Sequence, residues 1–231
     1  MKPLSTLLLS LLLAPHLAGC ASNGDPRDPL EPMNRAIHDF NEGLDRAVMK
    51  SVATGYQKVM PGFAQTGVRN FFSNLNDVTV LANNMLQLKL ENSVSDVLRI
   101  SFNSTFGFLG VLDIASEMGL DKQNEDFGQT LGHWGVGNGA YLVLPFFGPS
   151  SFRDGAGLVV DMTYTDLLQQ VSDIPRRTQT SVLRVVSRRA DLIEAKNAID
   201  AAALDPYEFT RDLYLERRRA QVHDGRPPAE E

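Results

Sequence analysis

Residues 28–48 read DPLEPMNRAIHDFNEGLDRAV, and this stretch indicates the kind of fold that the chain adopts. Asp28 can cap a helix whose first position is Pro29, and Glu31 can complete a capping box with it. Apolar residues then recur at intervals of three and four, which is the spacing of one helix face. They are Leu30, Met33, Ile37, Phe40, Leu44 and Val48. The stretch therefore predicts an amphipathic helix.

The same start signal recurs at 205–208, DPYE, and predicts a last helix that ends near Val222. Between these two helices, apolar periodicity predicts five more, at 61–72, 77–88, 92–106, 150–171 and 178–203. No run alternates at period two, and nothing repeats at the period of a solenoid. The sequence therefore predicts a mainly α fold in a single domain of amphipathic helices.

The stretch from Gly132 to Gly157 differs from the rest because it is rich in glycine. Its apolar run 141–147, YLVLPFF, contains Pro145, which argues against a central strand. We expect an apolar loop or short hairpin here. Such a segment fits a loop that lines an opening inside a membrane-seated protein. A simple buried hairpin in a soluble domain is the alternative.

The N-terminus is typical of an exported lipoprotein. Lys2 is followed by the leucine-rich run 4–13 and then by Leu17-Ala18-Gly19-Cys20, the layout of a signal peptide and lipobox. We expect removal of residues 1–19 and acylation of Cys20, the chain's single cysteine, which leaves no thiol for other chemistry. Ala21, in place of an aspartate, predicts the outer membrane, facing the periplasm. A soluble secreted protein whose cysteine falls there by chance is the alternative. A transmembrane segment is not expected, because the apolar run is too short to cross a bilayer.

The remaining chain divides into a flexible tether at 20–27, a helical domain at 28–222 and a disordered tail at 223–231. The formal net charge of the whole 231-residue chain is −6 and no continuous basic stripe is present, so nucleic acid is not an expected partner. Residues 70–120 have few charged side chains but many asparagines and serines. That composition fits a place where ions are poorly solvated, and it fits an ordinary buried core equally well.

No catalytic or metal-binding pattern stands out, so we predict neither an enzyme nor a cofactor. A hydrolase using Ser150 or Ser151 with His133 and Asp154 is conceivable, but there is no G-x-S-x-G motif and these serines fit a helix start. The basic run 217–219 is interpreted as a solvated helix end, with binding to anionic lipid or a partner as the alternative.

Several blocks of sequence occur in a characteristic order. They are DPLEPMNR at 28–35, FN at 40–41, NFFSNL at 70–75, NSTFGFLGVLDIA at 103–115, EDFGQTLGHWG at 125–135, YLVLP at 141–145, GPS at 148–150 and RD at 153–154. Together they resemble the blocks of the MlaA (VacJ) lipoprotein family, over most of residues 28–215.

This resemblance implies a ring of helices in the inner leaflet of the outer membrane, with an amphipathic channel through the ring. The family removes phospholipids misplaced in the outer leaflet and passes them to a periplasmic carrier, MlaC, which returns them to the inner membrane. It works beside trimeric porins such as OmpC or OmpF. Phospholipid would be the transported ligand, and the covalent lipid on Cys20 the anchor.

The resemblance also implies a gate, in which the loop around 135–147 is the family's gating hairpin and Phe40-Asn41 belongs to a block that controls the channel. The gate residues carried over are Phe40, Asn41, Gly135, Gly137, Gly139, Tyr141, Leu144 and Pro145. Ala140 and Val78 depart from the family pattern, which affects the expected local loop shape. We expect a passive conduit with a glycine-hinged gate. A structural lipoprotein that carries no lipid is the alternative.

Overall fold

The computed structural model describes residues 25–228. The predicted leader at 1–19, the predicted lipidation site at Cys20 and the end of the tail at 229–231 lie outside the described residues.

The protein is mainly α with one small hairpin, which confirms the predicted fold class. In chain order the elements are α2 (Glu31–Leu44), the π-helical η2 (Asp45–Met49), α3 (Lys50–Val59), α4 (Gly62–Leu86), α5 (Leu90–Thr105), α6 (Ile114–Glu117), α7 (Phe127–His133), β1 (Tyr141–Leu144), β2 (Gly148–Ser151), α8 (Phe152–Tyr164), α9 (Ile174–Asp191), α10 (Ile193–Ala202) and α11 (Pro206–Val222).

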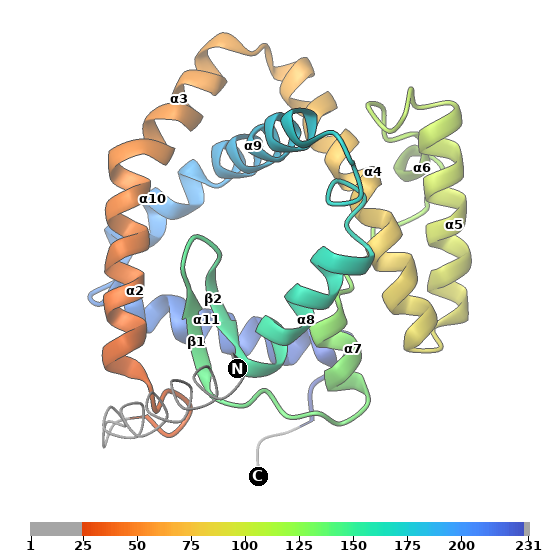
Figure 1. The fold of residues 1–231 in the computed structure, drawn as a ribbon. Helices are drawn as coiled ribbons and strands as arrows, with labels where there is room; N and C mark the ends of the chain where they lie inside the picture. Colours follow the sequence, from red (N-terminus) through yellow and green to blue (C-terminus); the bar gives the residue numbers. More distant parts are fainter. Residues whose placement is uncertain (1–24, 229–231) are drawn as a thin grey trace, which may run out of the picture.

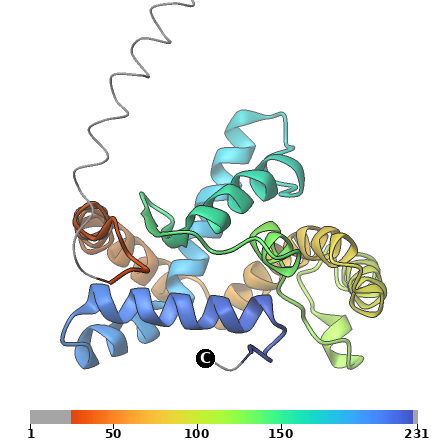
Figure 2. The same ribbon diagram turned by 90° about the horizontal axis from the view of Figure 1, so that it is seen from below.

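The helices run round a closed circuit, and the β1–β2 hairpin projects toward its middle (Figure 1). The continuous helix α2–η2–α3 forms one side, α4 the opposite side, and α7, α8 and α11 close the circuit at the bottom of the view. In the perpendicular view, α10 and α11 lie together on one face of the molecule (Figure 2). The α4–α5 pair lies at the outer edge in both views.

The first helix differs from the predicted one at both ends. It begins at Glu31, and its N-cap residue Leu30 makes no side-chain cap. The Asp28 carboxylate is fully buried and accepts hydrogen bonds from Asn34 and Tyr207, so it is not available as a cap. At the other end the helix continues through η2 and α3. The second predicted start is confirmed, since Asp205 caps α11.

The predicted helices at 61–72 and 77–88 are one helix, α4. The predicted helix start at residue 77 was wrong, because Asp77 lies inside α4, where it is fully buried and pairs with Lys122 and Arg99. A carboxylate held by tertiary ion pairs does not interrupt the backbone of its own helix, and no proline breaks this one.

The predicted helix at 150–171 is shorter in the structure, where α8 ends at Tyr164. The N–H groups of Thr165 and Asp166 both donate to Asp161 O, which closes the last turn. The predicted helix at 178–203 starts earlier, at Ile174, and is divided at Leu192 into α9 and α10. The short helices α6 and α7 were not predicted, because four and seven residues are too few to show a period.

Both described ends of the chain make contacts with the helical body. In the predicted tether, Arg27 donates to Asp212 of α11 at 3.0 Å. In the tail that was expected to be disordered, residues 223–225 form a turn after α11, and Asp224 accepts a hydrogen bond from Lys89.

Candidate functional site

The glycine-rich stretch folds as the antiparallel hairpin β1–β2, whose turn is residues 145–147. Leu144 pairs with Gly148 across this turn. Pro145 lies in the turn, where its missing N–H removes no bond from the ladder. Phe146 has a φ of 68° and a side chain that is 73% exposed. The tip therefore exposes a bulky apolar side chain. Its backbone conformation is one that such residues rarely adopt.

Asn34 of α2 binds the backbone of β1. Its Nδ2 donates to Tyr141 O at 3.0 Å, and Val143 N–H donates to its Oδ1 at 2.9 Å. One carboxamide thereby takes the place of a peptide group in a neighbouring strand. Asn34 is fully buried, so this pair of hydrogen bonds is shielded from water.

Asn41 lies two turns further along the same face of α2 and repeats this contact at the tip. Its Nδ2 donates to Leu144 O at 3.0 Å, and Phe146 N–H donates to its Oδ1 at 2.9 Å. The Phe40 ring meets the Phe146 ring edge-on, with centroids 5.6 Å apart. Phe40 is 52% exposed, so the contacts at the tip are open to the surroundings.

The base of the hairpin belongs to the apolar cluster of the protein. Tyr141 and Val143 are buried together with Tyr207 of α11. Tyr207 donates its hydroxyl to Asp28, and Asn34 donates to the other carboxylate oxygen at 2.8 Å. Burial raises the pKa of Tyr207, and the neighbouring carboxylate raises it further, so this hydroxyl keeps its proton.

The glycine segment at 135–139 lies at the other end of β1. Gly135 and Gly139 have φ of 89° and 67°, which favour glycine, whereas Gly137 lies between them in open space. The first two residues of α8 donate their N–H groups to the carbonyls of residues 140 and 138, both at 3.2 Å. The segment is therefore attached to the start of α8.

Arg218 of α11 joins three elements through ion pairs. Its guanidinium donates to Asp154 of α8 at 2.9 Å and to Asp126, the cap of α7, at 2.6 Å. Burial alone would raise the pKa of Asp154, but the Arg218 charge and hydrogen bonds, including one from Tyr214, lower it. The interpretation of 217–219 as a solvated helix end was therefore wrong for Arg218, whose side chain is 8% exposed.

The residues of the conceivable hydrolase have structural roles. Ser151 caps α8 by accepting a hydrogen bond from Asp154 N–H at 3.1 Å. Asp154 binds Arg218 and Tyr214, and the His133 ring packs edge-on against Trp134. These contacts account for the serine and the aspartate without a catalytic role.

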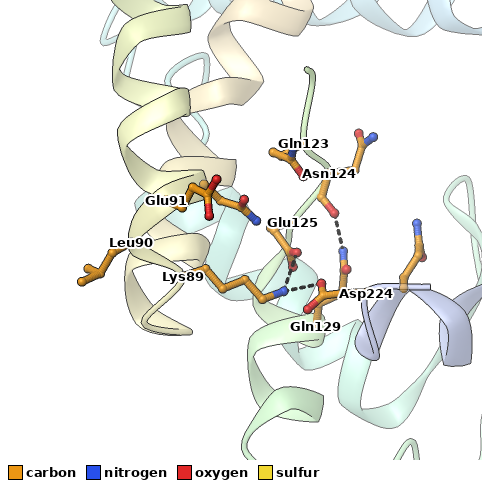
Figure 3. A pocket seen from close by; sticks show the side chains of 10 residues that line it. Lys89, Leu90, Glu91, Gln123, Asn124, Glu125, Gln129 and Asp224 are labelled. Carbon is orange, nitrogen blue, oxygen red and sulfur yellow. Dashed lines mark hydrogen bonds and ion pairs between the residues drawn. The ribbon is translucent and has the colours of Figure 1, made fainter. Parts of the chain in front are cut away.

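A polar cavity of about 600 Å³ lies apart from the hairpin, between the start of α5, the start of α7 and the end of α11 (Figure 3). Lys89 bridges Glu125 and Asp224 across it, and Gln129 donates to Asn124 O at 3.0 Å. Two carboxylates already neutralise Lys89, so the cavity, as lined by the described residues, offers no free cation. The same ion pairs link the three segments that line the cavity.

The comparisons with known proteins bear on this arrangement of ring and hairpin. The family model described as MlaA lipoprotein matches residues 26–221, which is most of the chain. The chain belongs to the MlaA lipoprotein family. The resemblance of its sequence blocks to this family is thereby confirmed.

Two relatives of this MlaA-family chain are named "Intermembrane phospholipid transport system lipoprotein MlaA". The protein of Shigella flexneri is 32% identical over 230 residues, covering 96% of this chain and 89% of that protein. The protein of Haemophilus influenzae is 31% identical over 231 residues, covering 96% and 92%. A solved structure from work on the "structural basis for maintenance of bacterial outer membrane lipid asymmetry" matches with a TM-score of 0.74 and 30% identity, over 84% of this chain and 98% of that one.

The MlaA-family chain buries polar groups and exposes apolar ones to an unusual degree. Among residues 25–228, buried polar and charged side chains outnumber buried hydrophobic ones. The outer helix α5 turns Asp96 and Arg99 inward and exposes apolar side chains. Those on α5 and in the following turn are Leu90, Val94, Val97, Leu98, Phe106, Phe108 and Leu109. Across the described chain, no helix combines the length and hydropathy that crossing a bilayer requires.

The structure gathers part of the predicted gate of this MlaA-family chain in one place. Phe40, Asn41, Tyr141, Leu144 and Pro145 all lie on the hairpin or on the α2 face that holds it. The three predicted glycines lie at the opposite end of β1, beside α8.

Sequence reasoning missed Asn34 and Asp28 as residues of this site. The available signal for Asn34 was its spacing from Asn41, because two asparagines two turns apart on one helix face can bind one strand. Asp28 gave no such signal, since its partners Asn34 and Tyr207 come from different helices.

Proposed function

We propose that this chain is an outer-membrane lipoprotein that takes mislocalised phospholipids from the outer leaflet and passes them to a periplasmic carrier. Acylation of Cys20 would anchor it at the periplasmic face, and the lipid would move through an amphipathic channel in the ring. The names of its relatives, which describe an intermembrane phospholipid transport system, support this proposal.

The observation that carries the proposal is the inverted distribution of polar and apolar side chains. In a soluble protein, an extended exposed apolar surface marks a contact with membrane or protein. Here such a surface covers α5, while the buried side of that helix holds charged groups. Arg99 contacts Asp113 at 3.2 Å and Asp77 at 3.5 Å, and both ion pairs face away from the exposed apolar stripe. This distribution suits a ring seated in one leaflet.

The hairpin is the proposed gate. Its apolar tip, with Phe146 and Phe147 exposed, projects toward the middle of the ring (Figure 1). Contact between the tip and α2 rests on Asn41 and Phe40, so breaking few interactions would release it.

Two protein partners complete the proposal. A carrier of the MlaC type would accept the phospholipid in the periplasm for return to the inner membrane. A trimeric porin of the OmpC or OmpF type would hold the ring in place. The charge-poor outer face of α5 is a surface of the kind that a barrel wall or lipid tails would cover.

Lipid transfer from reconstituted membranes tests the proposed function. The acylated chain is placed in vesicles with a fluorescent phospholipid, and a soluble MlaC-type carrier is added. We expect the carrier to gain phospholipid faster than from vesicles without the chain. Equal rates would instead favour a structural lipoprotein that carries no lipid.

Photocrosslinking in cells tests the route of the lipid. A photoreactive residue at Leu144, on the hairpin, or at Leu81, on α4, should give phospholipid adducts. The control position is Glu216, on the exposed face of α11. Adduct yields at Glu216 that match those at both test positions would contradict a route through the ring.

A further inference from the structure

We propose that Asn34 is a positioning residue that fixes the base of the hairpin, so that the gate opens only from Leu144 onward. This inference rests on the proposed function of the hairpin as a gate and assigns the part that moves. It places the bend within β1, whereas the sequence suggested a hinge at the glycines of 135–139.

The base of the hairpin is held from several directions. Asn34 binds both Tyr141 O and Val143 N–H, and Tyr141 N–H donates to Arg27 O at 3.0 Å. Tyr141 is 1% exposed and Val143 is 3% exposed. Freeing the base would break shielded hydrogen bonds and also expose an aromatic cluster, so it is costly.

Asn34 is itself fixed by a second layer of contacts. Its Nδ2 also donates to Asp28, whose other oxygen accepts the Tyr207 hydroxyl. Arg211 approaches the same carboxylate at 3.6 Å. The carboxamide therefore has one orientation, and the α2 helix and α11 both restrain the strand that it binds.

The tip has none of this support. Asn41 is half-buried, and its two hydrogen bonds reach residues on either side of Pro145. Within residues 25–228, the Phe146 ring meets one other aromatic ring, that of Phe40, and the Phe146 φ of 68° is unfavourable for a bulky residue. Release of the tip breaks two accessible hydrogen bonds and lets the Phe146 backbone relax.

The glycine segment is poorly suited to be the hinge, despite its composition. Its carbonyls at 138 and 140 accept hydrogen bonds from the first turn of α8. Moreover, a Cβ at Gly139 would lie 3.1 Å from Phe152 Cβ, so the backbones are already close. These glycines fit close packing of the α7–β1 connection against the start of α8, and a swing about them would pull Tyr141 out of its cluster.

Amide hydrogen exchange at single residues tests this proposal in the full acylated chain, reconstituted in lipid nanodiscs. The two informative amides are those of Val143, bound to Asn34, and Phe146, bound to Asn41. In the unmodified protein we expect the Phe146 amide to exchange about tenfold faster than that of Val143, once corrected for intrinsic rates. Rates within about twofold of each other would mean that the hairpin opens as one body, and would overturn the proposal.

Variants of Asn41 separate the tip from the base. We expect Asn41→Ala to raise exchange at Phe146 about fivefold or more and to leave Val143 unchanged. Asn41→Asp keeps an acceptor for Phe146 N–H and should preserve more protection than alanine does. The matched control is Asn70→Ala, which removes one similar hydrogen bond, to Val111 O at 3.2 Å, elsewhere on the ring. Equal increases at Val143 and Phe146 in Asn41→Ala would overturn the proposal.

The variant Asn34→Ala should raise exchange at Val143 and Phe146 together, because the whole hairpin then loses its base. An Asn34→Ala protein that folds and exposes only Phe146 would contradict a role for Asn34. Should it not fold, the unmodified protein and the Asn41 variants still decide the matter. Phospholipid transfer, measured on the same samples, distinguishes the fixed base from the proposed function of the hairpin as a gate. If Asn41→Ala opens the tip without faster transfer, the fixed base is supported but the gate is overturned.

Discussion

We predict that the ion pairs of Arg218 stabilise the closed ring of helices. Arg218→Met removes the guanidinium but keeps an apolar stem of similar length, so packing along α11 is largely retained. The change removes one of the two guanidinium groups that compensate the burial of the Asp154 carboxylate, which is 7% exposed; Arg153 still contacts it at 2.9 Å. Breaking a buried pair costs about 3–5 kcal/mol, and the remaining Arg153 places the expected loss at the lower end of that range. Asp126 adds little, because its side chain is 38% exposed and screened by solvent.

A loss of about 3 kcal/mol lowers the Tm of a chain of this size by about 6–12 °C. The assay is thermal unfolding of the full chain in detergent, followed by circular dichroism. The control is Arg217→Met, the same chemical change at the exposed neighbouring residue, which should shift the Tm by no more than about 2 °C.

The pH dependence of the difference checks its electrostatic origin. Asp154 has a pKa below its ordinary value in the folded protein, so its contribution to stability is complete above about pH 4. It is lost as the pH falls through that lowered pKa. The gap in Tm between the unmodified chain and Arg218→Met should therefore be constant from pH 7 to about 5 and narrow below about 4. The reasoning would be refuted if the gap in Tm persisted unchanged at pH 3. It would also be refuted if Arg218→Met had the same Tm as Arg217→Met.

Three further predictions use the same unfolding assay or the transfer assay. Gly157→Ala should destabilise the protein by about 3 kcal/mol or more, since its Cβ would lie 2.4 Å from the α7 backbone, whereas Gly155→Ala in the same helix has room and should be neutral or slightly stabilising. Burial raises the pKa of Asp161, so ionisation of its carboxylate lowers the stability of the folded chain as the pH rises above about 4. The stability of Asp161→Asn relative to the unmodified chain should therefore increase between about pH 4 and 7. A decrease in this relative stability would contradict the prediction. Gly139→Ala, at a φ of 67°, should destabilise by about 1 kcal/mol but leave phospholipid transfer unchanged, because this segment is not the proposed hinge, while Gly137→Ala should change neither.

The parts of this fold that depend on local chemistry could be predicted from the sequence. Asp205 caps α11 as expected, because a cap needs only the following two or three residues. The hairpin was also anticipated as one of two outcomes, since glycine, proline and apolar residues determine it within a few positions. The predicted acylation of Cys20 lies outside the described residues.

The parts that depend on distant partners could not be predicted. Asp28 has the sequence context of a helix cap, yet its carboxylate instead contacts the Tyr207 hydroxyl and the Arg211 guanidinium. Arg218 lies in a run of arginines that looks solvated, and only the ring's closure brings Asp126 and Asp154 to it. A one-dimensional pattern carries no information about which carboxylate meets which cation across more than sixty residues of chain.

The π-helical turn Asp45–Met49 fixes the phase between the two halves of the long first helix. Such a turn holds an additional residue compared with an α-helical one. Rewinding the same five residues as a regular α-helix would rotate everything upstream by about 100° and shift it by about 1.5 Å. Asn34 and Asn41 would then turn away from the hairpin, even though Asp45 could keep its ion pair with Arg189. In this helix, the winding of one turn is as constrained as the identity of its residues.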